Sequence, residues 1–157
     1  MQKYESILRE INLEIEKFNV LLVEEFRIVS LNASDSESCY VIADVPWSDQ
    51  VWPQNQLFPG VYILCARHQT DSKRLGAYIG KASLNHIGSR LWAHLYPHSA
   101  TNIYLMYDLS GEPFIIEAIV AIGLRDSRMR ALATALEEFI IAGVRERVHL
   151  LNGTGNV

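Results

Sequence analysis

Five side chains in this sequence are candidates for acid–base and ionic chemistry: Tyr62, Tyr78, Arg90, His94 and Glu137. Phenol and imidazole groups give or take protons, a guanidinium fork binds oxyanions, and a carboxylate binds cations. Each tyrosine lies in a short apolar run bounded by glycine. A tyrosine in a strand is by itself most often a packing residue, so any chemistry depends on whether the fold brings the five groups together.

Residues 84–96 predict a helix, with Ser83 or Asn85 as its cap. At about 100° per residue, Arg90 and His94 fall within or beside its apolar stripe. The stripe consists of Ile87, Leu91 and Leu95. An arginine on that side faces the sheet, where a guanidinium without an anionic partner is costly. An anionic ligand or a structural ion pair would each satisfy it.

A second helix is predicted from the capping pair Asp126-Ser127 to about Arg147. Glu137 lies at the border of its apolar stripe, whereas Glu138 lies about 200° from the stripe residue Leu136 and is solvated. The stripe consists of Met129, Leu132, Leu136, Phe139 and Ile140. Of the two carboxylates, Glu137 is therefore the one placed to hold a cation at the edge of the core.

Strands must position the tyrosines. Residues 60–66 and 76–80 predict a hairpin, in which alternation puts Tyr62 and Leu64 on one face. The other face takes Val61, Ile63 and Cys65. A second hairpin is predicted from residues 102–109 and 114–124.

The first third of the chain predicts an amphipathic helix over residues 2–18, then a hairpin of strands 26–29 and 39–42. Residues 46–59 hold two tryptophans and three prolines, which indicates an irregular connection. The tryptophans are interpreted as packing over the core edge, with a DNA or partner contact as the alternative.

Charge divides the chain at residue 60. Residues 1–59 hold four Lys/Arg against ten Asp/Glu, a net charge of −6, and residues 60–157 hold ten against eight, a net charge of +2. The second part therefore contains the candidate phosphate-facing patch, although an ordinary scatter of surface charge would look similar. The patch consists of Arg67, Lys73, Arg74, Lys81 and Arg90, opposed only by Asp71.

Bulk composition bounds the protein class. With 157 residues, 49% of them hydrophobic, the chain can bury one core but not two full domains. Cys39 and Cys65 are too few for a disulfide framework. The charged start MQKYESILRE lacks the apolar core of a secretory signal, and no apolar stretch approaches a membrane span. These features predict a cytoplasmic protein with no membrane partner.

Over residues 60–152 the sequence resembles the GIY-YIG nucleases. Gly60-Val61-Tyr62 resembles the first motif, with Val for the commoner Ile, and Tyr78-Ile79-Gly80-Lys81 resembles the second. The remaining matches are the arginine, the histidine one turn later, the helix glutamate and the asparagine beyond it: Arg90, His94, Glu137 and Asn152. The departures are a long loop between the tyrosines, two extra residues before Arg90, and Gly88 inside the helix.

This resemblance implies an α+β fold, a small antiparallel β-sheet flanked by helices. The module would span residues 60–157, with residues 1–59 as an acidic extension, a helix and a hairpin, packed on it. It also implies an endonuclease that hydrolyses DNA phosphodiester bonds with one Mg²⁺ or Mn²⁺ ion.

The resemblance also assigns roles to residues. Glu137 would bind the metal, Tyr62 would be the general base, and Arg90 would clamp the scissile phosphate. Tyr78 and His94 would orient water or phosphate. The expected substrate-binding residues are Lys81, Lys73, Arg74 and Asn152.

Alternatives remain open from the sequence. The chain could be a nuclease-like module that binds nucleic acid or protein without cutting, although the retention of Tyr62, Arg90 and Glu137 together argues against this. A zinc site formed by His86, His94 and His98 matches no common zinc spacing. Whether two chains pair as a homodimer is also open.

Overall fold

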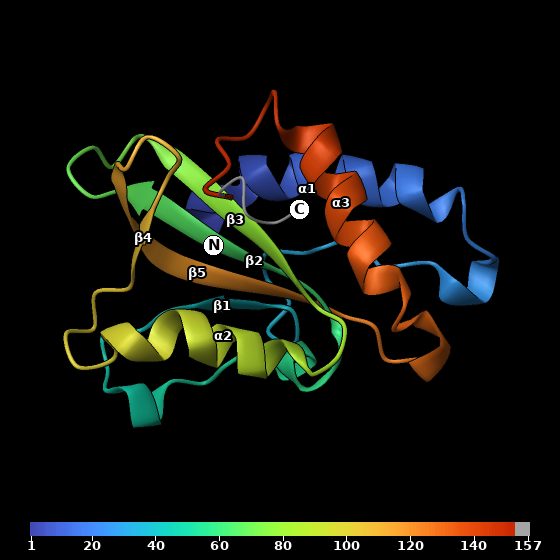
Figure 1. Ribbon diagram of the computed structural model, residues 1–157, viewed down its shortest axis with the longest axis horizontal. Coiled ribbons are helices and arrows are strands. Elements are labelled where there is room, and N and C mark those ends of the chain that lie inside the picture. The colour runs from blue at the N-terminus through green and yellow to red at the C-terminus, as the bar shows by residue number, and fades with distance from the viewer. Residues whose placement is uncertain (153–157) are drawn as a thin grey trace.

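Five antiparallel strands form a sheet at the centre of this computed structural model, which describes residues 1–152. The strands are β1 (Cys39–Val41), β2 (Gly60–His68), β3 (Leu75–Ala82), β4 (Leu105–Tyr107) and β5 (Pro113–Gly123). Their order is β1-β5-β2-β3, and β4 also pairs with β5. Strand β3 is therefore the last strand on its side of the sheet (Figure 1).

Three helices cover the two faces of this sheet. Helices α1 (Glu5–Asn19) and α3 (Leu132–Val144) pack together on one face, and α2 (Ile87–Leu95) packs on the other (Figure 1). The predicted class, α+β with a small antiparallel sheet flanked by helices, is confirmed.

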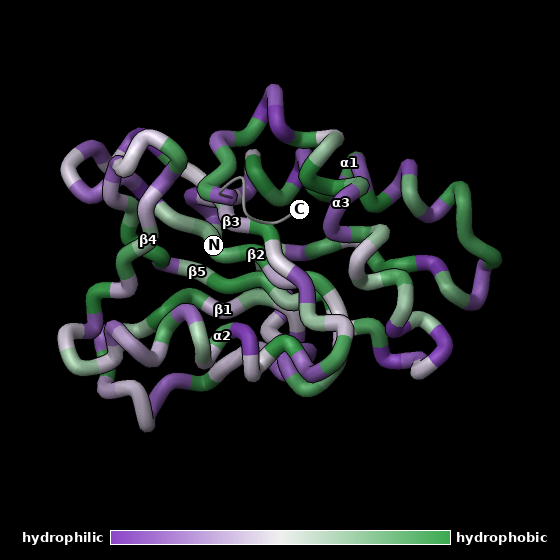
Figure 2. Tube along the Cα trace, in the orientation of Figure 1, coloured by the Kyte–Doolittle hydropathy of each residue, from purple (hydrophilic) through white to green (hydrophobic). Residues whose placement is uncertain are grey.

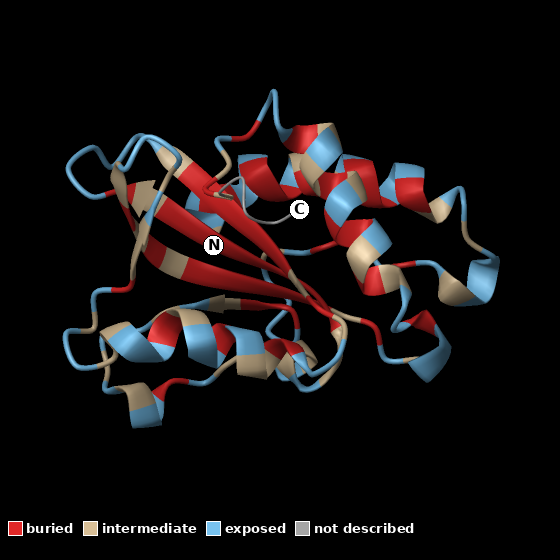
Figure 3. Ribbon diagram, in the orientation of Figure 1, coloured by how far each residue is buried: buried red, intermediate tan, exposed pale blue. Residues whose placement is uncertain are grey.

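The alternation predicted for β2 is also confirmed. Tyr62 and Leu64 belong to the hydrophobic cluster under α2, whereas Val61, Ile63 and Cys65 belong to the cluster under α1 and α3. Strands β2 and β5 are buried over most of their length (Figure 3) and are mostly hydrophobic (Figure 2). A sheet covered on both faces provides a rigid support for side chains at its edge.

The N-terminal hairpin predicted from strands 26–29 and 39–42 is wrong. Only residues 39–41 form a strand, β1, and it pairs with β5. Residues 27–32 are extended but belong to no strand, because side chains of α1 take the backbone bonds that a neighbouring strand would supply. Asn19 bonds both N and O of Ile28, and Asn12 bonds both N and O of Leu31.

Both helix starts near the site differ from the prediction. Helix α2 begins at Ile87, and its cap is His86, whose Nδ1 accepts a hydrogen bond from Ser89 N at 3.2 Å. Neither Ser83 nor Asn85 is the cap. Asp126 caps a short 3₁₀ turn, and α3 begins only at Leu132.

The acidic N-terminal helix α1 packs on α3. Glu14 is buried at this contact and forms ion pairs with Lys17 and Arg147, both at 2.8 Å. Burial raises its pKa, but the hydrogen bonds from Lys17 and Arg147 outweigh burial and hold the pKa below its usual range. A Cβ on Gly143 of α3 would lie 2.2 Å from the Glu14 carboxyl group, so glycine permits this close crossing.

No helix within residues 1–152 has both the length and the hydropathy to cross a membrane.

Candidate active site

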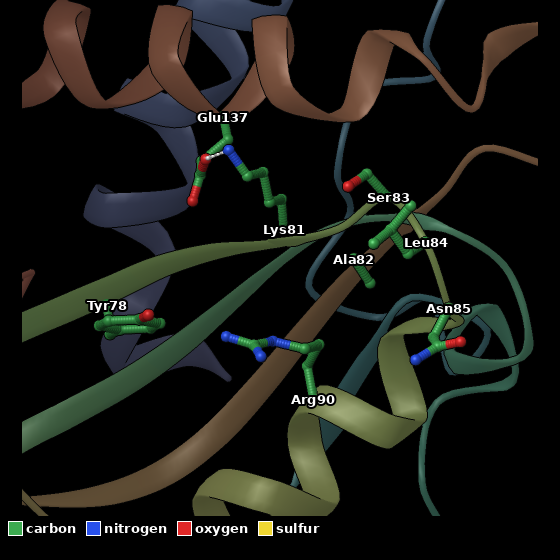
Figure 4. Close-up of a pocket in the computed structure, with 8 residues that line it drawn as sticks. All are labelled: Tyr78, Lys81, Ala82, Ser83, Leu84, Asn85, Arg90 and Glu137. Atoms are coloured by element: carbon green, nitrogen blue, oxygen red, sulfur yellow. Dashed lines mark ion pairs between the residues drawn. The ribbon is translucent and has the colours of Figure 1, made fainter. Parts of the chain in front are cut away.

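A pocket of about 380 Å³ lies at the β3 edge, between α2 and α3 (Figure 4). Alternation along β3 sends Tyr78 to the α2 side and Lys81 to the α3 side of this pocket. Side chains from both faces of the sheet therefore meet around β3. The lining consists of Tyr78, Lys81, Ala82, Ser83, Leu84, Asn85, Arg90 and Glu137.

Two tyrosines and a histidine pack together on the α2 side. The Tyr62 hydroxyl lies 3.0 Å from His94 Nε2. The ring of Tyr78 has its centroid 6.1 Å from that of Tyr62 and 5.0 Å from that of His94. Tyr62 is fully buried, and of these three rings it is Tyr78 that lines the pocket.

The position of the Tyr62 ring explains why residue 80, in the second motif, is a glycine. Gly80 pairs directly with Tyr62 in the β2–β3 register. A Cβ at residue 80 would lie 2.4 Å from both Cζ and Oη of Tyr62. The phenol therefore lies over a strand position where any side chain would collide with it.

We expect Gly80→Ala to displace the Tyr62 phenol from His94. Because the collision is with a fully buried ring, the free energy of unfolding should fall by about 1–3 kcal/mol. Gly76→Ala is the matched control on the same strand, since its Cβ would first meet a Leu151 methyl group at 3.0 Å. Urea unfolding of both variants checks this. Equal losses of stability would contradict a specific clash at Gly80.

Glu137 and Lys81 form the α3 side of the pocket. Glu137 is 4% exposed, and its Oε2 lies 3.3 Å from Lys81 Nζ. Burial raises the Glu137 pKa above its ordinary value of 4.5, while Lys81 opposes the shift and the neighbouring Glu138 adds to it. Glu138 itself is exposed, as predicted. Glu137 is thus a desolvated carboxylate that is ion-paired with Lys81 and lies within the field of Arg90.

Arg90 approaches the same space from α2. Its side chain is exposed, yet the guanidinium extends toward Tyr78 across the pocket (Figure 4). Burial raises the pKa of the Tyr62 hydroxyl and Tyr78 adds to the effect, while a hydrogen bond and charge from Arg90 oppose it. Burial, and then the charge of Arg90, lower the His94 pKa below 6.5. At neutral pH the group therefore consists of a protonated phenol and a neutral imidazole beside a fixed cation.

No protein-family profile, curated protein or solved structure matches this chain. The resemblance to GIY-YIG nucleases rests on the six matched positions, five of which lie in or beside the pocket.

The sixth matched position, Asn152, has a different environment. Its Oδ1 accepts a hydrogen bond from Ile79 N at 2.9 Å, and its Nδ2 donates one to Ile79 O at 2.6 Å. Ile79 lies between Tyr78 and Gly80 on β3. With both polar atoms of its amide hydrogen-bonded to the backbone of Ile79, Asn152 supports the β3 edge, and it does not line the pocket.

The predicted basic patch is divided between the two ends of the β2–β3 hairpin. Lys73 and Arg74 lie at its turn, opposite the end that carries Lys81. Arg74 forms an ion pair with Glu112, and Arg67 forms one with Glu117. Of the five residues of the patch, Lys81 and Arg90 line the pocket, so one continuous phosphate path does not form.

Arg130 is a supporting residue that the sequence did not indicate. Its guanidinium donates hydrogen bonds to the carbonyl oxygens of Ser83 and Leu84, which line the pocket. These bonds join the start of α3 to the loop between β3 and α2. No sequence pattern marks Arg130, because its partners are backbone atoms.

Within residues 1–152, no three His, Cys, Asp or Glu side chains gather as a metal-binding group. His86 serves as a helix cap, which leaves the alternative zinc site without support. A single carboxylate still fits Mg²⁺, which commonly keeps several waters and takes one or two carboxylates together with substrate phosphate oxygens. The donor set around Glu137 is compatible with a hydrated hard cation and does not suit zinc.

Proposed function

We propose that this protein is a DNA endonuclease that hydrolyses phosphodiester bonds with one divalent metal ion. The observation that carries the proposal is that Arg90 of α2 and Glu137 of α3 line one edge pocket with Tyr78, whose ring packs against the hydrogen-bonded pair of Tyr62 and His94. A buried carboxylate can hold a metal ion, an arginine can stabilise charge on the phosphate, and a phenol–imidazole pair can accept the proton of an attacking water.

Glu137 would hold Mg²⁺ or Mn²⁺ through its carboxylate, which lies in the pocket beside Lys81. When bound, the ion supplies positive charge that stabilises the leaving 3′ oxygen. Arg90 would bind the non-bridging oxygens of the scissile phosphate, where a guanidinium fork matches the negative charge that grows in the transition state. Lys81 would neutralise the remaining phosphate charge.

Tyr62 and His94 would together move the proton of the attacking water. The Tyr62 oxygen would accept a proton from water while its own proton passes to His94 Nε2, which lies 3.0 Å away. The water oxygen would form the new bond to phosphorus as the bond to the leaving oxygen breaks. A neutral imidazole suits this role better than an isolated phenolate, because burial raises the Tyr62 pKa.

The rate of cleavage is expected to fall on acidification. Glu137 must be ionised to hold the metal, and its pKa lies above 4.5. His94 must be neutral to accept a proton, and its pKa lies below 6.5. Both groups become protonated as the pH falls, so a pH–rate profile should show an acid limb, with the His94 contribution below pH 6.5.

Arg90→Gln should raise the His94 pKa, because burial and the charge of Arg90 are the two causes that lower this pKa. NMR titration of the imidazole without metal measures this, and Arg125→Gln is the remote control. An unchanged titration of His94 would contradict the electrostatic contact on which the proton path depends.

The direct test is incubation of the protein with plasmid and branched DNA, with and without Mg²⁺ or Mn²⁺. We expect metal-dependent nicking or linearisation. Binding of DNA without cleavage under any metal would instead identify a nuclease-like binding module. DNA is the partner in this proposal, the cytoplasm is its location, and a homodimer that cuts both strands is a hypothesis for sedimentation analysis.

A further inference from the structure

Four aromatic rings contact one another in a row beside α2, one pair stacked face to face and the others in edge or tilted contacts, and the proposed reaction does not use them. The rings of Trp92 and Tyr96 are stacked, with centroids 4.6 Å apart and planes at 11°. Tyr96 meets Trp47 at 5.6 Å, and Trp47 meets Trp52 at 4.9 Å. These four residues are called the aromatic stack below. Trp47 and Trp52 pack against the core, so the stack is anchored at one end.

The other end of the aromatic stack is exposed. Trp92 is 55% exposed, an unusual fraction for the largest apolar side chain. Tyr96 lies one turn after Trp92, so its ring covers the indole face turned toward the C-terminal end of α2. Gly88, one turn before Trp92 on α2, has no side chain that could cover the indole.

The amide of Gln56 lies beside Gly88, one turn of α2 from Trp92. Its Oε1 lies 2.7 Å from the point where a Cβ on residue 88 would stand. The glycine inside α2, which costs about 1 kcal/mol of helix stability relative to alanine, therefore admits a polar group one turn from Trp92. A flat ligand that stacked on the indole would present its edge to this amide.

The surface around the stack suits a polyanion. Residues 83–101, which include α2, contain no Asp or Glu, while they hold Arg90 and three His. Around α2, Trp92 lies about 160° from Arg90, and the exposed arc between them is formed by the small residues Ser89 and Ala93. The facing turn Trp47–Asp49 contributes one carboxylate, Asp49. A nucleic acid strand that crosses α2 from the aromatic stack to the pocket would therefore meet small side chains and little negative charge.

We propose that the aromatic stack binds an unpaired nucleotide of the DNA that the pocket cuts. This inference rests on the proposed function and narrows the substrate to DNA with a single-stranded segment beside the scissile phosphate. Every base has a π-face that can stack on an indole, whereas the bases within a duplex are already stacked on each other. Because a helix is about 10–12 Å across, a few nucleotides separate the stacked base from the phosphate at Arg90.

The test measures binding by fluorescence anisotropy in EDTA, so that it does not depend on cleavage. The probes are a blunt duplex and the same duplex with a single-stranded flap. We expect the wild type to prefer the flap, and Trp92→Ala to lose about tenfold in flap affinity, roughly the effect of stacking one base, with duplex affinity unchanged. Trp92→Phe should restore part of the loss. Tyr107→Ala, an exposed aromatic residue on β4, is the control.

The outcomes separate this inference from the proposed function. If the protein cleaves DNA with metal, but wild type and Trp92→Ala bind both probes with equal affinity, base binding by the aromatic stack is contradicted and the proposed nuclease activity is supported. If flap binding depends on Trp92 but no metal supports cleavage, base binding by the aromatic stack is supported and the proposed nuclease activity is contradicted. Trp92→Ala that converts a dimer to a monomer without changing DNA affinity would show a protein interface and overturn the inference.

Discussion

Replacing Glu137 by glutamine is expected to abolish metal-dependent cleavage, with a loss of about a thousandfold or more. Glutamine keeps the shape of the side chain but removes the charge that would hold the cation. Glu138→Gln is the matched control, because it changes the adjacent, exposed carboxylate on the same helix. Comparable losses in both variants would contradict the assignment of Glu137.

The same substitution is expected to stabilise the protein in EDTA at pH 7. Burial raises the Glu137 pKa, so the folded state disfavours the charged form. The contribution of this group to stability is present below its unfolded value of 4.5 and is lost as the pH rises through the folded value. Glutamine is neutral, so Glu137→Gln avoids that loss of stability. The difference in stability between the variant and the wild type should disappear near pH 4. Mg²⁺ should raise the Tm of the wild type but not that of Glu137→Gln.

Replacing Arg90 by alanine is expected to lower turnover of bound DNA by about a hundredfold to a thousandfold. Its effect on affinity should be much smaller, because one phosphate contact among many contributes little to binding. Single-turnover cleavage and anisotropy in EDTA measure the two quantities separately. Arg125→Ala is the control, since that arginine is exposed and paired with Glu37 away from the pocket. A collapse of affinity with unchanged turnover would make Arg90 a docking residue.

The site was predictable wherever it depends on periodicity. Helical spacing turned Arg90 toward the sheet, whereas its side chain is exposed beside the pocket. The same kind of spacing separated the buried Glu137 from the exposed Glu138, and strand alternation put Tyr62 on the α2 side. The latter two predictions succeeded because a local period fixes the direction of a side chain once the element exists.

The unpredicted features depend on contacts between distant parts of the chain. Residues 26–29 have the apolar alternation of a strand, yet their backbone is satisfied by Asn19 of α1. Arg130 and Asn152 act on backbone atoms 47 and 73 residues away. Since a side-chain bond to a distant backbone atom leaves no periodic trace, no pattern in the sequence could indicate these supports.

The crossing of α1 with α3 has a consequence for when the pocket can form. Glu14 and Arg147 are 133 residues apart in the chain, and their ion pair lies at the helix contact that seats α3, the bearer of Glu137. A contact of such long sequence separation forms late, because the intervening chain must first be closed into a loop. During synthesis, α1 can pack on α3 only after the residues up to about 147 have been made. The pocket, and any cleavage that it carries out, would therefore be complete only after α1 and α3 have joined.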